Sequence, residues 1–282
     1  MAELVGRPLL RKLFPKRPDW SHKGDFGKLL IIAGSRNCTG APVLTSLAAL
    51  RTGADLVIAA CPENASAATS TFPDIITFPL KGDRLSEKHV SKLLTLSLDA
   101  DAVVIGGGLG QEKHTQKAVV NFLKKLERPC VIDADAIRAL SGNMDILKKG
   151  FVLTPHANEF LSLTGEDPRK EIEDRKRIAM MYAGRLGTNL LLKGHVDIIT
   201  DGSRVCTNKT GNPFMTKGGT GETLSGICGA LLAMKADPFD AACAAAYING
   251  AAGDRAARKF GQGMLASDLV QEIPNIIKQA LK

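Results

Sequence analysis

A glycine-rich segment with one acidic residue, Gly218-Gly219-Thr220-Gly221-Glu222, precedes a run of small apolar residues that ends at Met234. A glycine loop that opens a helix leaves backbone N–H groups unpaired at the positive end of the helix dipole, and such groups bind anions, above all phosphate. Glycine also lets the backbone approach the anion closely. A carboxylate at the position of Glu222 can cap the helix, or it can accept a proton from a hydroxyl beside the phosphate. Taken alone, the segment favours the first interpretation, because glycine fingerprints are weak evidence by themselves.

Glycine and polar residues also follow several apolar runs that we predict as strands. These segments are Gly34-Ser35, Gly106-Gly107-Gly108-Leu109-Gly110, Asp133-Ala134-Asp135, Thr154-Pro155-His156 and Lys193-Gly194. Ligands of parallel α/β sheets bind beyond the carboxyl ends of the strands, where such segments come together. Their convergence favours a binding site, although the glycine segment at 106–110 could equally be a tight turn.

The polar residues at these strand ends have alternative roles that the sequence leaves open. Asp133 could cap the following helix or hold Mg²⁺ through water, since Mg²⁺ prefers oxygen ligands, whereas for Asp135 we favour capping. His156 could be a loop histidine with satisfied hydrogen bonds, or a donor that positions a ligand. We expect Asn158 to cap the next helix. Lys193 could be a surface residue or the counter-charge of a phosphate.

The apolar pattern alternates between strands and helices along the chain, with one antiparallel hairpin around Asp201-Gly202. The predicted strands cover residues 28–33, 56–60, 75–78, 102–105, 131–133, 152–153, 190–192, 197–200 and 204–207. The predicted helices cover residues 41–53, 86–98, 115–126, 135–140, 172–186, 222–234, 239–259 and 267–282, with another after Asn158. This alternation predicts an α/β protein with a mostly parallel sheet and helices on both faces. We expect residues 1–21 to form a basic N-terminal arm or lead-in and residues 22–282 to form a single domain.

Composition narrows the class of protein and of ligand. No apolar run approaches the roughly 20 residues that span a bilayer, and the N-terminus lacks the apolar core of a signal peptide, so we expect a cytoplasmic protein without a membrane partner. The six cysteines form no C-x-x-C pair, which argues against a metal or disulfide framework. The net charge of +8 suits a small anionic ligand or simply a solvated basic surface. No nucleic-acid motif is visible, so we expect no nucleic-acid partner.

A series of segments occurs in an order that is specific to one family. They are HKGDFGKLLIIAGS, TGAP followed by ALRTGADLV, VVIGGGLG, VIDADAI, LTPHANEF, LLKGHVDII and GNPFMTKGGTGETLSGICGALLA. Together they resemble the ADP/ATP-dependent NAD(P)H-hydrate dehydratase family, from about residue 22 to the C-terminus. Many members of that family also carry an N-terminal epimerase domain, and we expect this chain to be a stand-alone dehydratase.

The resemblance implies a ribokinase-like three-layer sandwich and a metabolite-repair reaction. In that reaction a nucleoside polyphosphate phosphorylates the C6 hydroxyl of hydrated NADH or NADPH (NADHX or NADPHX), and elimination of phosphate restores the cofactor. The enzyme would be a carbon–oxygen lyase that uses Mg²⁺ and ADP, or ATP, as phosphoryl donor, and that releases AMP when ADP is used. The resemblance also implies a homo-oligomer, up to a tetramer. The chemistry requires positioning and charge stabilisation, because phosphate is a far better leaving group than hydroxide.

The resemblance assigns roles to individual residues by position. Glu222 matches the catalytic acid that contacts the substrate. The residues that match or adjoin contacts of the hydrated cofactor are Ala41, Gly108, Gly110, His156 and Glu222. The residues that match or adjoin contacts of the nucleotide are Lys193, Gly194, His195, Val196, Asp197, Asn212, Gly218, Gly219, Thr220 and Gly221. No protein ligand of the metal is assigned beyond Asp133, through water.

The chain departs from the family pattern at several positions. Glu222 stands where the family has Asp, and its extra methylene moves the carboxylate by roughly 1.5 Å, a misplacement that can cost on the order of 100-fold in rate. The site could have adjusted to the longer acid, work poorly, or bind nucleotide without turnover. Gly107 replaces the usual proline. The other departures are Cys38, Asn158, Phe214 and Lys217. A different ribokinase-like kinase, for a thiazole or hydroxymethylpyrimidine alcohol, is the remaining alternative function.

Overall fold

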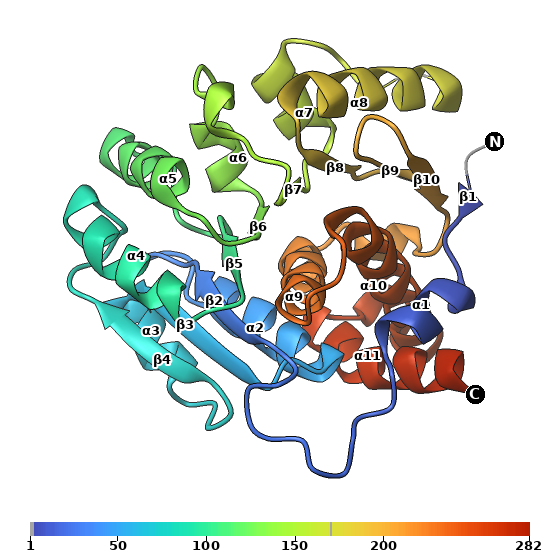
Figure 1. Ribbon diagram of the computed structural model, residues 1–282, viewed down its shortest axis with the longest axis horizontal. Helices are drawn as coiled ribbons and strands as arrows, with labels where there is room; N and C mark the ends of the chain where they lie inside the picture. The colour runs from blue at the N-terminus through green and yellow to red at the C-terminus, as the bar shows by residue number, and fades with distance from the viewer. Residues whose placement is uncertain (1–2, 170) are drawn as a thin grey trace.

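The computed structural model describes residues 3–169 and 171–282, and within them one ten-stranded sheet runs through the molecule (Figure 1). Its strand order is β1-β10-β9-β8-β7-β6-β5-β2-β3-β4. From β4 to β8 in this order, successive strands pair in parallel, whereas β9 is antiparallel to both β8 and β10. The strands are β1 Glu3–Leu4, β2 Lys28–Ile32, β3 Leu56–Pro62, β4 Ile76–Leu80, β5 Ala102–Ile105, β6 Cys130–Ile132, β7 Phe151–Leu153, β8 Asn189–Leu192, β9 Asp197–Thr200 and β10 Val205–Asn208.

Helices cover both faces of this sheet (Figure 1). The α-helices are α1 Arg7–Leu13, α2 Gly40–Thr52, α3 Glu63–Thr69, α4 Val90–Leu98, α5 Lys113–Lys125, α6 Asp135–Ala139, α7 Ala157–Thr164, α8 Ile172–Leu186, α9 Thr220–Ala233, α10 Pro238–Phe260 and α11 Ala266–Leu281. One core lies between the sheet and α1, α2, α9, α10 and α11, and a second lies between the opposite face and α4 to α8. The three-layer α/β sandwich expected from the sequence is confirmed.

The two cores follow from the period of two residues along each strand. In β2, Leu29 and Ile31 point into the first core, and Leu30 and Ile32 point into the second. Both faces of a central parallel strand are covered by helices, so the strand reads as an unbroken apolar run. For this reason, short apolar runs that lack any alternation with polar residues predicted the strands.

The chain differs from the sequence expectation mainly in its N-terminal part. Of the arm expected at residues 1–21, β1 pairs in parallel with β10, and α1 packs against α11, where Arg11 Nε donates to the carbonyl of Ala280 at 2.9 Å. The domain boundary at residue 22 stays a prediction. The helix α3 was not predicted, because its alanine-rich sequence has no amphipathic period. The hairpin of β9 and β10 is confirmed.

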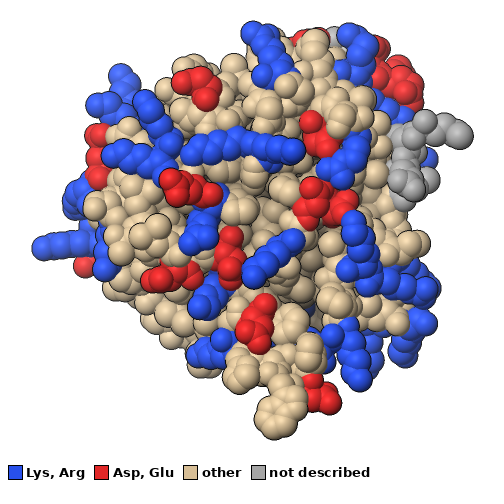
Figure 2. Space-filling model, in the orientation of Figure 1, with Lys and Arg blue, Asp and Glu red and all other residues tan. Residues whose placement is uncertain are grey.

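Charge is spread over the surface rather than confined to the termini. Figure 2 shows basic and acidic side chains interspersed on one face, with basic ones gathered over α1 and α11 at the lower right. In the described part of the chain, no helix is both long and apolar enough to cross a bilayer.

Candidate active site

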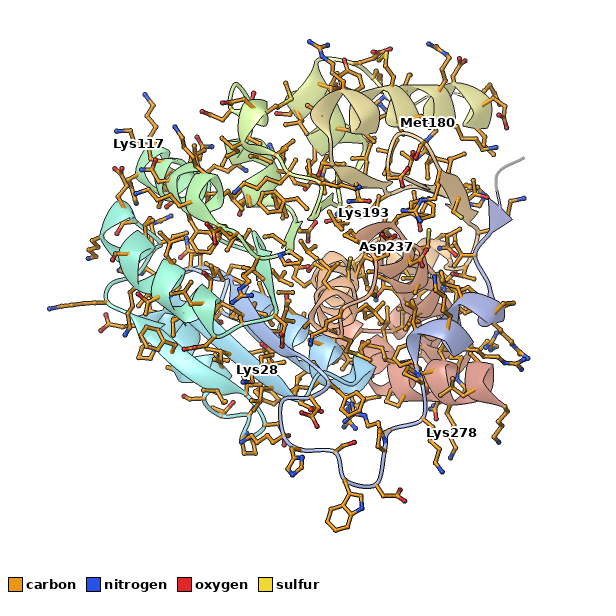
Figure 3. All side chains as sticks on the ribbon, in the orientation of Figure 1. Lys28, Lys117, Met180, Lys193, Asp237 and Lys278 are labelled. Carbon is orange, nitrogen blue, oxygen red and sulfur yellow. The ribbon has the colours of Figure 1, made fainter. Side chains whose placement is uncertain are left out.

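A cavity of about 830 Å³ lies beyond the carboxyl ends of β6, β7 and β8 and beneath the start of α9. Its lining includes most of the site residues predicted from the sequence: Asp133, His156, Lys193, Gly194, His195, Asp197, Asn212, Gly218, Gly219, Thr220, Gly221 and Glu222. Figure 3 shows Lys193 near the centre of the molecule, at the end of β8. The segments converge here because parallel strands end at the same edge of the sheet.

The remaining predicted residues, Ala41, Gly108, Gly110 and Val196, do not line this cavity. A Cβ on Gly107 would lie 3.3 Å from Glu222 Cγ and 3.5 Å from the Cβ of Ala41, and one on Gly108 would lie 3.3 Å from Ala41. Ala41 therefore lies close to the Glu222 side chain, and Gly108 lies against Ala41. Val196 is different, because its side chain is buried in the second core and does not line the cavity.

The glycine segment forms the start of α9. Gly219 is the N-cap with φ of +100°, and a Cβ there would lie 2.6 Å from Leu44 Cδ1, so only glycine fits this turn. The Thr220 hydroxyl donates to the carbonyls of Met215 at 2.8 Å and Lys217 at 3.0 Å, which ties the loop to the helix. The first N–H groups of α9 thus border the cavity at the positive end of a 14-residue helix.

Glu222 lines the cavity in the first turn of α9. Burial raises the pKa of its carboxyl, the negative charge of Asp133 raises it further, and Lys193 opposes the shift. A carboxylate with a raised pKa is a better proton acceptor than an exposed one near neutral pH. Glu222 is therefore equipped for proton transfer rather than for helix capping alone.

A charged cluster forms the floor of the cavity. Lys193 Nζ lies 3.1 Å from Asp133 Oδ1 and 3.7 Å from Glu159 Oε2, and the Thr154 hydroxyl donates to Asp133 Oδ1 at 2.7 Å. Burial alone would lower the pKa of Lys193, but Asp133, Glu159 and Glu222 raise it above its ordinary value. Lys193 is a fixed cation within the cavity, so the interpretation of it as a simple surface residue is wrong.

His156, not Asn158, caps α7. The ring Nδ1 accepts from the backbone N–H of Asn158 at 3.1 Å and of Glu159 at 3.2 Å, while Nε2 lies 3.2 Å from Glu159 Oε1. Glu159 in turn accepts from the backbone N–H of His156 at 2.8 Å, completing a capping box. The expectation that Asn158 caps this helix was wrong, because the helix begins at Ala157, two residues before the start that an Asn158 cap implies. The ring still lines the cavity, with both nitrogens engaged.

Asp135 fixes the glycine turn instead of capping α6. Its Oδ2 accepts from the backbone N–H of Gly110 at 2.9 Å, whereas the N-cap of α6 is Ala134. Gly106, Gly108 and Gly110 all have positive φ, and a Cβ on Gly106 would collide with the carbonyl of Asp133. The capping role favoured for Asp135 is therefore wrong, because the strand after the turn brings its carboxylate back against residues 106–110.

Hydrogen bonds that involve Asp197, Asn208 and Arg175 hold the turn at residues 193–197 in its shape. The backbone N–H of Gly194 donates to Asp197 Oδ1 at 2.9 Å, and the amide of Asn208 donates to Asp197 Oδ2 at 3.0 Å. Arg175 on α8 donates to the carbonyl of Lys193 at 3.3 Å and lies so close to Gly194 that a Cβ there would be 2.6 Å from its guanidinium. Asp197 therefore shapes the segment through the hydrogen bonds that its carboxylate accepts.

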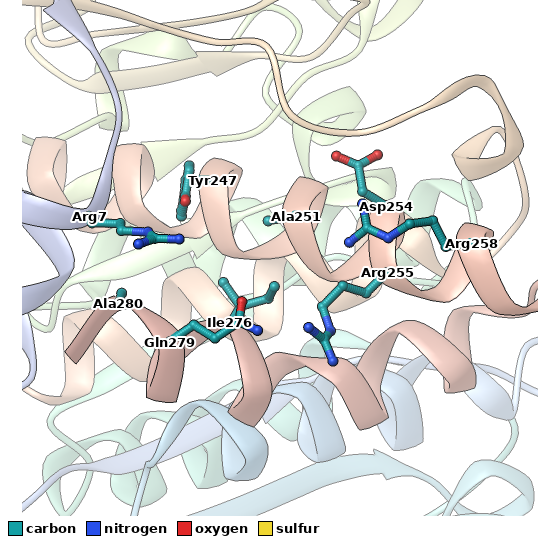
Figure 4. Close-up of a pocket in the computed structure, with 9 residues that line it drawn as sticks. All are labelled: Arg7, Tyr247, Ala251, Asp254, Arg255, Arg258, Ile276, Gln279 and Ala280. Carbon is teal, nitrogen blue, oxygen red and sulfur yellow. The ribbon is translucent and has the colours of Figure 1, made fainter. Parts of the chain in front are cut away.

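Sequence reasoning missed the residues of α10 that hold the loop in place. Asp254 accepts from the backbone N–H of Gly211 at 3.1 Å and from the amide of Asn212 at 3.0 Å, and Asn249 donates to the carbonyl of Thr220 at 3.2 Å. Figure 4 shows the Asp254 carboxylate directed away from Arg255, at the edge of a smaller cavity of about 180 Å³. The sequence signal that could have identified them is the pair Asn249-Gly250 and Gly253-Asp254, which lie one turn apart in an alanine-rich helix.

The residues present fit a Mg²⁺ ion that arrives with phosphates. Among the residues that the structure describes, no group of three or more His, Cys, Asp or Glu side chains could hold a metal ion alone. Mg²⁺ is commonly bound by one or two carboxylates together with substrate phosphates. Asp133 faces the cavity, and its charge raises the pKa of Glu222, a repulsion that a cation there would relieve.

Comparison with known proteins places the chain in a family. A family model described as NAD(P)H-hydrate dehydratase matches residues 29–275. The chain is 47% identical over 270 residues to the bifunctional NAD(P)H-hydrate repair enzyme Nnr of Pyrobaculum aerophilum, covering 94% of this chain and 53% of that protein. It is 40% identical over 281 residues to the ADP-dependent (S)-NAD(P)H-hydrate dehydratase of Cenarchaeum symbiosum, covering 98% and 97%. The chain thus spans about half the length of the first relative and nearly all of the second.

A solved structure shares the whole fold. The ADP/ATP-dependent NAD(P)H-hydrate dehydratase of Bacillus subtilis, co-crystallised with ATP and Mg²⁺, superposes with a TM-score of 0.83 at 27% identity, covering 99% of both chains. This overlap confirms the ribokinase-like sandwich expected from the sequence. The chain belongs to the NAD(P)H-hydrate dehydratase family.

Proposed function

We propose that this protein is an ADP-dependent (S)-NAD(P)H-hydrate dehydratase, a carbon–oxygen lyase that repairs hydrated NADH and NADPH. The observation that carries the proposal is the position of Glu222, a carboxylate with a raised pKa beside the anion-binding start of α9 and above the Lys193 cation. The name of the Cenarchaeum symbiosum relative supports ADP as donor, and the Bacillus subtilis structure supports a nucleotide with Mg²⁺.

The geometry accounts for the two parts of the reaction. Glu222 accepts the proton of the C6 hydroxyl while the oxygen of that hydroxyl forms a bond to the β-phosphorus of ADP. The bond between the β-phosphorus and the bridging oxygen breaks, and AMP leaves with that oxygen. The C6–O bond then breaks, phosphate leaves with the bonding electrons, and loss of a proton restores the dihydronicotinamide ring. The N–H groups of α9 and the Lys193 ammonium stabilise the negative charge on the phosphoryl oxygens.

We assign the two ends of the site to different ligands. Residues 193–197 and the glycine segment at 218–221 would hold the adenine nucleotide, and Asn212 would act through the loop it builds. Ala41, Gly108, Gly110 and His156 would contact the hydrated cofactor. Asp133, through water, would help to hold Mg²⁺, which would supply charge neutralisation between the phosphates.

The direct test is recovery of NADH absorbance from NADHX with ADP and Mg²⁺, on the parent and on Glu222→Asp. Comparable activity of both supports the proposal and shows that the site has adapted to the longer acid. A silent parent with an active Asp variant would mean that one methylene blocks turnover in an intact site. Silence of both proteins with ADP and with ATP would refute the dehydratase function, and a stable phosphorylated alcohol would identify a kinase.

Two further properties belong to the same proposal. We place the enzyme in the cytoplasm, where reduced nicotinamide cofactors are used, and expect a homo-oligomer, up to a tetramer. Light scattering during size-exclusion chromatography would measure the oligomeric state, and a monomeric mass at micromolar concentration would contradict it.

A further inference from the structure

Gly107 differs from the glycines around it because its backbone does not require glycine. Gly106 and Gly108 have φ of +143° and +65°, and a Cβ on either would collide, with the Asp133 carbonyl or with Cys38 Sγ. Gly107 has no positive φ. Its carbonyl accepts from the backbone N–H of Gly34 at 2.7 Å, a bond that any residue could make.

The nearest neighbour of a side chain at Gly107 would be Glu222. A Cβ would lie 3.3 Å from Glu222 Cγ and 3.6 Å from Glu222 Oε1, with the Cβ of Ala41 next at 3.5 Å. Contacts of 3.3 Å between carbon atoms are inside the optimal separation, so one partner must move. Gly107 is buried and bonded to Gly34, whereas Glu222 can rotate about its side-chain bonds. The Glu222 side chain would therefore be displaced.

We infer that Gly107 is a positioning residue for Glu222: the missing side chain leaves the space in which the methylene groups of Glu222 carry its carboxylate into the cavity. The inference rests on the proposed function, in which Glu222 accepts the substrate proton. The inference requires the two side chains to match in volume: the volume of a methyl group added at residue 107 nearly equals that of a methylene removed at residue 222. Volume-conserving exchanges of this kind are the ones that packed sites tolerate.

A double-mutant cycle tests the match. The proteins are the parent, Gly107→Ala, Glu222→Asp and the double variant. Gly263→Ala serves as the control, because a Cβ there meets no atom within 4 Å and its φ is not positive. For each we would measure kcat for NADH recovery, KM for ADP and the melting temperature.

We expect Gly107→Ala to lower kcat about tenfold in the parent, since sub-ångström displacement of a reacting group is costly. KM for ADP and the melting temperature should match those of the control. In the Glu222→Asp background the same change should alter kcat less than about twofold. Equal losses in both backgrounds, or no loss in the parent, would overturn the inference.

Crystal structures of the parent and of Gly107→Ala provide a readout that is independent of turnover. We expect the Glu222 carboxylate to be displaced in the variant, while the Gly34–Gly107 hydrogen bond is kept. An unmoved carboxylate would overturn the inference even if the parent proved inactive. An inactive parent with a displaced carboxylate in the variant would instead refute only the proposed function.

Discussion

Lys193 Nζ lies 3.1 Å from Asp133 Oδ1, which joins the end of β8 to the end of β6 across the intervening β7. The Asp133 side chain is 3% exposed, and that of Lys193 is 21% exposed. The floor of the cavity therefore holds a buried anion, Asp133, and a cation, Lys193, that is partly exposed to solvent. The pair links the stability of the fold to the charge of the site.

Loss of the cation should destabilise the protein. Lys193→Met leaves Asp133 buried without its counter-charge, and we expect the free energy of unfolding to fall by about 3 kcal/mol, the lower end for a broken buried pair because Lys193 partly reaches solvent. The double variant Asp133→Asn with Lys193→Met should recover most of this loss while nucleotide binding stays weak. Urea unfolding and calorimetric titration with ADP measure the two effects. Equal stability of the single and double variants would contradict this account.

Activity should depend on pH through Glu222. Its pKa is raised, so the deprotonated base is lost on acidification at a higher pH than for an ordinary glutamate, and kcat/KM should fall below that pH. Asp133→Asn removes a charge that raises this pKa and should move the acid limb to lower pH. Lys193→Met removes one that lowers it and should move the limb to higher pH. The surface variant Asp99→Asn is the control and should leave the acid limb of the pH profile unchanged. If the limb is also unchanged in both site variants, a group other than Glu222 titrates.

Asp254 should govern nucleotide affinity without touching the nucleotide. Asp254→Asn places an amide where the loop offers two donors, and we expect the dissociation constant of ADP to rise about tenfold, as for loss of a hydrogen bond to a charged group. Asp240→Asn, on the same helix but paired with Lys12 at the surface, should leave the ADP affinity unchanged. Isothermal titration calorimetry makes the comparison. Equal affinities of the two variants would mean that the loop holds its shape without Asp254.

His156 should have a structural effect that can be separated from substrate contact. His156→Ala removes the cap of α7 and should lower the free energy of unfolding by about 1 kcal/mol. His156→Asn should restore most of that stability, because asparagine is a good N-cap, but not KM for NADHX if the ring contacts the substrate. Denaturant unfolding and steady-state kinetics on both variants decide the matter. Recovery of both quantities by asparagine would leave His156 only its capping role.

Local pattern determined most of the fold and the outline of the site. The apolar runs predicted strands such as β2 and β5, and the glycine segment before Glu222 predicted the start of α9. These features can be predicted because strands and helices bury residues with a fixed period, and because a positive φ at a turn favours glycine. The resemblance to a family predicted that residues 193–197 and Glu222 belong to one site, and all of them except Val196 line the same cavity.

Only the tertiary structure decided which side chains meet. Lys193 pairs with a carboxylate 60 residues away, and Asp254 holds a loop 42 and 43 residues before it. Such partners depend on the order of strands in the sheet and on how helices pack over it, which a local period does not encode. The roles of Asp135 and Gly107 were hidden for the same reason: each is set by a backbone or side chain that folding brings alongside, so its physical cause exists only in the folded protein.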